Sequence, residues 1–252
     1  MSEGTHEVPA PSFYAVPAGH RRPAADWWVL LHPPYTLWHL SYVAIGAAIA
    51  PRLDGGRLAA TLLAFFLAVG LGAHALDELK GRPLRTEIPG WLLTSVAAAS
   101  LLAAVGLGIV GIARIGAGLG VFIVVGVALN CGYNLELFDG RLHNDFVFAL
   151  AWGSFPVLTA YYAQAATLRV SALIAALAAY WLSTAQRALS TPARALRRRI
   201  ASIEGTVTYN DGHTATLSRP VLLAPLETAL KAAAAGVVAL AASLLLYRFM
   251  DL

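Results

Sequence analysis

Long apolar runs alternate with short polar connectors along most of the chain. A bilayer core about 30 Å thick needs roughly 20 apolar residues in a helix that crosses it, and seven runs reach or approach that length. None of them shows the period-two alternation of a membrane β-barrel strand. The pattern predicts an all-α, multi-pass transmembrane helical bundle of about seven spans over residues 28–252. The seven runs are Tyr35–Ala50, Leu58–Leu76, Trp91–Val110, Ile115–Leu135, Phe146–Gln164, Val170–Ala188 and Thr228–Met250.

Two polar stretches fall outside these runs. Residues 1–27 are polar, contain several prolines and lack the apolar centre of a signal peptide, so we expect a flexible cytoplasmic tail. Residues 189–227 form a long connector on the same predicted side. Within it, Thr206–Tyr209 and His213–Leu217 alternate in polarity around an Asn-Asp-Gly turn, which predicts a β-hairpin. Two roles are open for this hairpin: a lid over a cytoplasmic mouth, or a solvated projection.

Composition and charge support a membrane location. Hydrophobic residues make up 58% of the chain and charged residues 13%, against roughly 25% charged residues in soluble domains. The net charge of +4 does not indicate nucleic-acid binding, because the basic residues lie beside the apolar runs. With the N-terminus inside, thirteen Lys and Arg residues lie on the cytoplasmic side and five outside. We therefore expect an integral protein of a prokaryotic plasma membrane with a cytoplasmic N-terminus; the oligomeric state is not predicted.

The second apolar run ends in a cluster of ionisable residues. His74, Asp77 and Glu78 follow the i, i+3, i+4 spacing of one helical face. Ionisable groups at membrane depth are costly and mark functional sites more often than elsewhere, and this set suits a hard divalent cation. Lys80 and Arg82 follow directly and would neutralise the charge of a phosphate. The alternative is an interfacial charge cluster where a helix leaves the membrane.

A second polar group follows the fourth apolar run, on the same predicted side as the first. Its acidic members are Glu136, Asp139 and Asp145, and its basic one is Arg141. We expect Asp145 to share a site with the first cluster. Tyr133 and Asn134, at the end of the run itself, are candidate substrate-binding residues. Arg141 joins the lysine and arginine of the first cluster as a phosphate-binding candidate.

Two further features concern the later helices. Pro156 predicts a kink in the fifth helix, where the backbone groups that it frees would face protein or a cavity. Arg194 and Arg197–Arg199 form a basic patch suited to anionic lipid headgroups.

Three segments carry a family resemblance. His32–Ala50, the Arg82-Pro83-Leu84 that follows the second run, and Trp152–Tyr162 together resemble the UbiA superfamily of intramembrane prenyltransferases, over roughly residues 30–190. The resemblance implies a UbiA-like helical bundle that transfers a prenyl chain from a diphosphate, using Mg²⁺ held by two aspartate-rich motifs. Of the first motif, Asn-Asp-x-x-Asp, only Asp77 is retained. The stretch at the place of the second motif, Ser183–Pro192, contains no carboxylate.

The resemblance implies an enzyme that acts on an isoprenoid diphosphate with Mg²⁺, in a cavity open to the cytoplasm. Asp77, His74 and Asp145 would be its catalytic residues, and Asp77, Glu78, Asp139 and Asp145 its metal ligands. The alternative is a non-catalytic membrane protein that binds a lipid or a partner and has kept the bundle without the second metal motif. The expected partners are an isoprenoid lipid or prenyl diphosphate and membrane lipids, with no nucleic acid.

Overall fold

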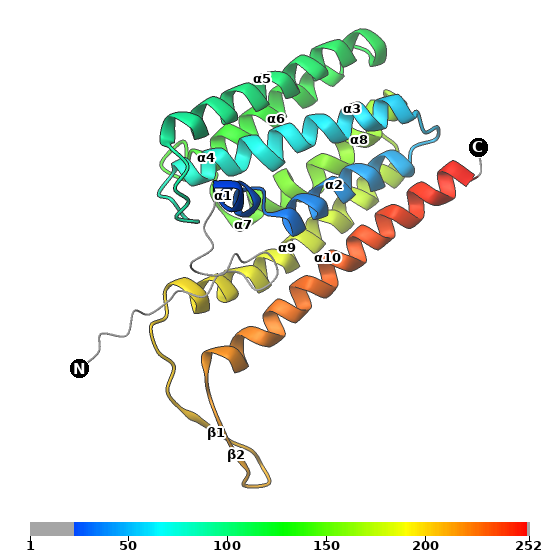
Figure 1. Ribbon diagram of the computed structural model, residues 1–252. Helices are drawn as coiled ribbons and strands as arrows, with labels where there is room; N and C mark the ends of the chain where they lie inside the picture. The colour runs from blue at the N-terminus through cyan, green and yellow to red at the C-terminus, as the bar shows by residue number, and fades with distance from the viewer. Residues whose placement is uncertain (1–22, 251–252) are drawn as a thin grey trace.

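Residues 23–250 are described by a computed structural model of the chain and form a bundle of long helices (Figure 1). Every one of the seven predicted apolar runs coincides with a helix. The helices are α2 (Pro33–Ala48), α3–η1–α4 (Gly55–Phe65, Phe66–Ala73 and His74–Leu79), α5 (Gly90–Ile115), α6 (Leu119–Asn134), α7–η2–α8 (Asp145–Ala149, Leu150–Ser154 and Phe155–Ala165), α9 (Val170–Arg198) and α10 (Arg219–Met250).

The predicted all-α class is confirmed, and the apolar helices among residues 23–250 support a membrane location. Four helices are long and apolar enough to cross a bilayer: α3–η1–α4, α5, α7–η2–α8 and α10. The apolar helix α6 is shorter, and a crossing by α2, α6 or α9 stays a prediction. α9 and α10 are joined near the ends of their long helices by Arg197 and Glu227, both buried, whose Nη2 and Oε1 atoms lie 2.8 Å apart.

A short helix, α1 (Pro23–Leu30), precedes the bundle. The part of the predicted tail before it lies outside the described residues. Leu30 is buried in the same apolar cluster as Leu76, and the Asp26 carboxylate accepts the backbone N–H of Glu87 at 2.7 Å. These contacts fix α1 against the loop that joins α4 to α5.

Two of the long helices contain a π-helical segment, η1 and η2, in which the regular hydrogen-bond ladder is interrupted. In an α-helix the carbonyl of Trp152 would accept the backbone N–H of residue 156. Pro156, which follows η2, has no N–H, so this carbonyl lacks that donor. His39 Nδ1 lies 2.9 Å from that carbonyl oxygen. In η1, the carbonyl of Ala68 accepts a bond from Asn130 Nδ2 at 2.8 Å. The prediction that backbone groups freed by Pro156 face protein is confirmed.

The predicted hairpin is present, as β1 (Thr206–Thr208) and β2 (Thr214–Thr216), paired antiparallel. It projects away from the helices, and its residues are almost all exposed (Figure 1). In this position it does not cover the bundle. The connector is shorter than the predicted 189–227, because α9 continues to Arg198 and α10 begins at Arg219.

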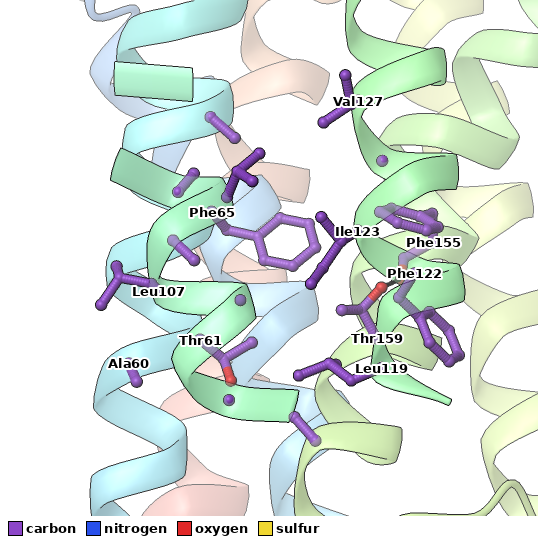
Figure 2. Close-up of a pocket in the computed structure, with 18 of the residues that line it drawn as sticks. Ala60, Thr61, Phe65, Leu107, Leu119, Phe122, Ile123, Val127, Phe155 and Thr159 are labelled. Carbon is purple, nitrogen blue, oxygen red and sulfur yellow. Dashed lines mark hydrogen bonds between the residues drawn. The ribbon is translucent and has the colours of Figure 1, made fainter. Parts of the chain in front are cut away.

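The two ends of the bundle differ in chemistry. At one end, called here the Tyr133 end, α4, α6 and α9 finish and α7 begins. At the other, called the Arg57 end, α3 begins and α8 finishes. An apolar cavity lies between α3, α5, α6 and α8 (Figure 2). Its volume is about 450 Å³, and the residues that line it include Arg57 at one end and Trp152 at the other. The cavity therefore belongs mainly to the half of the bundle opposite the predicted site.

Candidate functional site

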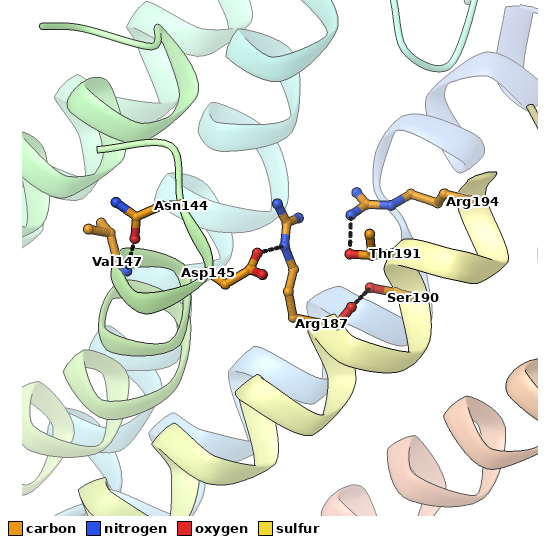
Figure 3. Close-up of polar contacts among 7 residues, drawn as sticks. All are labelled: Asn144, Asp145, Val147, Arg187, Ser190, Thr191 and Arg194. Atoms are coloured by element: carbon orange, nitrogen blue, oxygen red, sulfur yellow. Dashed lines mark hydrogen bonds and ion pairs between the residues drawn. The ribbon is translucent and has the colours of Figure 1, made fainter. Parts of the chain in front are cut away.

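Two arginines of α9 reach across the Tyr133 end. Arg187 and Arg194 are seven residues apart, which is about two helical turns, so both lie on one face of α9. Figure 3 shows the two side chains extending from the same side of the helix. Arg187 Nε donates to Asp145 Oδ1 at 2.7 Å, and the guanidinium lies 5.1 Å from the centre of the Phe148 ring. Arg187 thus joins α9 to the first residues of α7.

The start of α7 is fixed by a side-chain cap. Asn144 Oδ1 accepts the backbone N–H of Val147 at 2.9 Å (Figure 3), which satisfies one of the donors at a helix N-terminus. The cap places Asp145 in the first turn, where a carboxylate interacts favourably with the helix dipole. This local geometry aims Asp145 at Arg187.

Tyr133 lies at the centre of these charges. Its side chain is buried, with 5% of its surface exposed, and its hydroxyl has no hydrogen-bond partner among residues 23–250. Arg187, Arg194, Asp77 and Asp145 all lie close enough to interact electrostatically with this hydroxyl. The structure therefore brings Asp77 and Asp145 to one site, as the sequence predicts. A buried hydroxyl without a partner costs about 1–3 kcal/mol, so an acceptor from a ligand would be stabilising here.

The loop after α6 is held against Tyr133 by His143. The two rings are stacked with their centres 4.3 Å apart, and His143 Nδ1 lies 3.1 Å from the Tyr133 carbonyl oxygen. Because a carbonyl only accepts, Nδ1 carries the proton. This stacking fixes the ring of Tyr133 and covers it from the loop side.

A pair of histidines packs together within electrostatic reach of Arg194. The rings of His32 and His74 have their centres 4.9 Å apart, and His74 Nδ1 donates to the Gly70 carbonyl at 3.1 Å. Burial, followed by the charges of His74, Arg198 and Arg194, holds the pKa of His32 well below its usual 6.5. His32 is therefore neutral at pH 7, and the positive charge of the site comes from arginine.

Arg194 is the cation with most neighbours in this cluster. It interacts electrostatically with His32, Asp77 and Tyr133. Loss of hydration, and then the like charge of Arg187, lower the pKa of Arg194. An anion placed between the two guanidinium groups would offset both effects.

Glu78 does not face this cluster. Adjacent residues of an α-helix point about 100° apart, and the fully buried Glu78 carboxylate turns to the loop after α4. It accepts the N–H of Leu84 at 2.9 Å, and the N–H and Oγ1–H of Thr86 at 2.9 and 2.8 Å. The structure thus separates Glu78 from Asp77, although the sequence places them in one predicted metal site.

Lys80 and Arg82 also hold loops. Lys80 Nζ lies 3.8 Å from Glu136 Oε2 in an exposed pair. Arg82 Nη1 donates to the carbonyl of Ile88 at 2.6 Å. Gly81 and Arg82 have positive φ angles of 85° and 53°, so the backbone turns sharply between these two side chains. Neither side chain has a contact with Tyr133 or Arg187 among the interactions of the described residues.

Three further predicted residues lie elsewhere. Asn134 Nδ2 donates to the Asn130 carbonyl at 2.8 Å, within α6. Asp139 and Arg141 are exposed in the loop between α6 and α7. Of the predicted site residues, Asp77 and Asp145 interact with the Tyr133 hydroxyl, and His74 packs against His32.

The carboxylates do not fit a magnesium site. Magnesium requires several oxygen ligands in near-octahedral geometry, whereas Glu78 binds the loop after α4 and Asp145 binds Arg187. Within residues 23–250, no three His, Cys, Asp or Glu side chains are grouped so that they could hold a metal ion. We therefore derive no chemistry through a metal.

Arg187 is the site residue that sequence reasoning missed, and Arg194 was predicted only as part of a basic patch for lipid headgroups, not as a member of this site. The sequence feature that could have indicated both arginines is their seven-residue spacing on one face of α9. Arg187 lies within Ser183–Pro192, the stretch without a carboxylate, and Arg194 lies just after it. Their convergence on Tyr133 depends on how α7 and α9 pack, which the sequence pattern does not give.

Comparisons of the chain with protein-family models, with curated proteins and with solved structures find no match. The resemblance to the UbiA superfamily therefore rests on the sequence segments that carry it.

Proposed function

We propose that this integral membrane protein binds the phosphate or diphosphate headgroup of an isoprenoid lipid at the Tyr133 end, without a metal ion. The supporting observation is the convergence of Arg187 and Arg194 on the buried, unpartnered hydroxyl of Tyr133. A guanidinium presents a planar fork of donors that matches phosphate oxygens, and the phenol supplies one more donor. This proposal corresponds to the non-catalytic alternative that the sequence leaves open.

The same proposal includes the orientation of the bundle, with the Tyr133 end facing the cytoplasm. The support is the excess of Lys and Arg residues in the connectors at that end. Arg197–Arg199 continue the basic character beyond Arg194, at the end of α9, where anionic headgroups would lie.

A second candidate is prenyl transfer from an isoprenoid diphosphate. One observation favours it: Asp77 and Asp145, from different helices, both interact with the Tyr133 hydroxyl. The commitment of Glu78 to a loop and of Asp145 to Arg187 weighs against it. The two candidates differ in their requirement for Mg²⁺ and in product formation.

The test is binding of farnesyl diphosphate to the full chain in lipid nanodiscs, measured by calorimetry with Mg²⁺ and with a chelator. We expect equal affinity in both conditions and no released diphosphate. Arg194→Gln should weaken binding about tenfold to a hundredfold, because a hydrogen bond to a charged group is worth about 1.5–3 kcal/mol. Arg52→Gln, at an exposed arginine at the other end of the bundle, is the matched control and should bind like the wild type.

Two outcomes would contradict the proposal. If Arg194→Gln and Arg52→Gln bind equally well, the α9 arginines do not form the site. If diphosphate is released with Mg²⁺ and Asp77→Asn abolishes this release, the second candidate is correct.

A further inference from the structure

The cavity at the Arg57 end is apolar along its length. Figure 2 shows side chains of Phe65, Leu107, Phe122, Ile123 and Phe155 around it, contributed by different helices. Its lining on α3–η1 runs from Arg57 to Val69, which corresponds to roughly 18 Å at 1.5 Å rise per residue. The cavity is thus elongated and follows the helix axes.

The mouth of this cavity is basic. Arg57 and Arg114 line it together with Asp54. Arg57 is fixed there, since its Nη1 donates to the Gln164 carbonyl at 3.0 Å and its Nη2 to the Arg114 carbonyl at 3.2 Å. Carbonyl groups do not neutralise a guanidinium, so these bonds leave the charge of Arg57 uncompensated.

The basic character extends over the whole Arg57 end. In the described part of the chain, the connectors and helix termini there carry five arginines and one carboxylate, Asp54. The arginines are Arg52, Arg57, Arg114, Arg169 and Arg248. This excess of positive charge complements an anion.

We infer that the cavity binds one acyl chain of an anionic phospholipid from the leaflet at the Arg57 end, with its phosphate at Arg57 and Arg114. The cavity lies among membrane helices, so its occupant comes from the bilayer. A void leaves its lining atoms without dispersion contacts, which a chain restores. A free phosphate leaves the apolar lining uncovered, and a lipid without net charge leaves the excess of arginine uncompensated.

This site is independent of the proposed headgroup site. Trp152 closes the inner end of the cavity lining and makes an edge-to-face contact with Tyr133, with ring centres 5.9 Å apart. One ring therefore stands between the two sites, and each can be tested without the other.

The first test uses native mass spectrometry of the delipidated full chain, titrated with phosphatidylglycerol or phosphatidylcholine. Ala104 lines the cavity, and Ala103 is its exposed neighbour on α5. We expect Ala104→Phe to lose one tightly bound phosphatidylglycerol that the wild type and Ala103→Phe retain. Arg114→Gln should bind phosphatidylglycerol and phosphatidylcholine alike. Equal lipid binding by Ala104→Phe and Ala103→Phe, or no preference of the wild type for phosphatidylglycerol, would overturn the inference.

The second measurement does not depend on filling the cavity. Phosphatidylglycerol brominated near the end of its chain quenches tryptophan on contact, and the contribution of Trp152 is the difference between wild type and Trp152→Phe. Trp152 is buried, so chains of the surrounding bilayer do not reach it. We expect its fluorescence to be quenched by brominated phosphatidylglycerol. Absence of this quenching would show that no chain reaches the inner end.

Discussion

The imidazole of His39, on α2, donates from Nδ1 to the carbonyl oxygen of Trp152, 113 residues away on η2, at 2.9 Å. Both side chains are buried. The bond exists because Pro156 removes the donor that would otherwise serve this carbonyl. It joins two long helices at the depth of the candidate site and fixes the proton of His39 on Nδ1.

The first prediction tests this relationship. His39→Ala leaves the Trp152 carbonyl buried without a partner, so we expect the free energy of unfolding to fall by about 1–3 kcal/mol. In His39→Ala/Pro156→Ala, residue 156 regains an N–H and part of this loss should be recovered. Unfolding in mixed micelles, with Pro156→Ala alone as the third arm, measures the coupling. Strictly additive effects would show that the proline and the histidine are not linked.

The helices were predictable because their signal is local. An apolar run such as that of α5 needs no partner to be recognised, and the Asn-Asp-Gly turn indicates the hairpin in the same way. The π-helical segments were not predictable, because they depend on partners from other helices: Asn130 for Ala68, and His39 for Trp152.

The second prediction concerns Glu78, which the structure places in a loop contact and the sequence in a metal site. Glu78→Ala removes the acceptor of three hydrogen bonds, two of them buried, so we expect a loss of about 2–3 kcal/mol in stability. The loop after α4 should also become sensitive to a protease that cleaves at Arg82 or Arg85. Farnesyl diphosphate binding, measured below the unfolding temperature, should depend on Mg²⁺ no more than in the wild type.

Glu136→Ala is the control for this experiment. It breaks an exposed pair with Lys80, which is worth about 0–1 kcal/mol. A Glu78→Ala protein as stable as Glu136→Ala, with altered Mg²⁺ dependence, would favour the metal-ligand interpretation instead.

The site itself was only half predictable. Counting of membrane sides grouped Asp145 with Asp77, and both interact with the Tyr133 hydroxyl. The grouping of His74 with Asp77 by their spacing along one helix stays a prediction. The same spacing rule wrongly included Glu78, since residues one position apart diverge by about 100° and here meet different partners. Arg187 and Arg194 join the site only through the packing of α7 on α9, which no pattern within either helix specifies.

The last prediction is a dependence of stability on pH through His32. Burial and the neighbouring charges of His74, Arg198 and Arg194 lower the pKa of His32 in the folded protein, well below the 6.5 expected of the unfolded chain. Between these two pKa values the unfolded chain binds the proton and the folded protein does not. The stabilisation is therefore complete above about pH 6.5 and is lost progressively as the pH falls toward the folded pKa. Thermal unfolding in detergent from pH 8 to pH 5 measures this loss.

His32 has a left-handed backbone conformation, with φ of 43°, so asparagine is the replacement that tolerates it best. We expect His32→Asn to lose less stability than the wild type over this range. His213→Asn, in the exposed hairpin turn, should follow the wild-type profile. A His32→Asn profile parallel to that of the wild type would show that another group titrates.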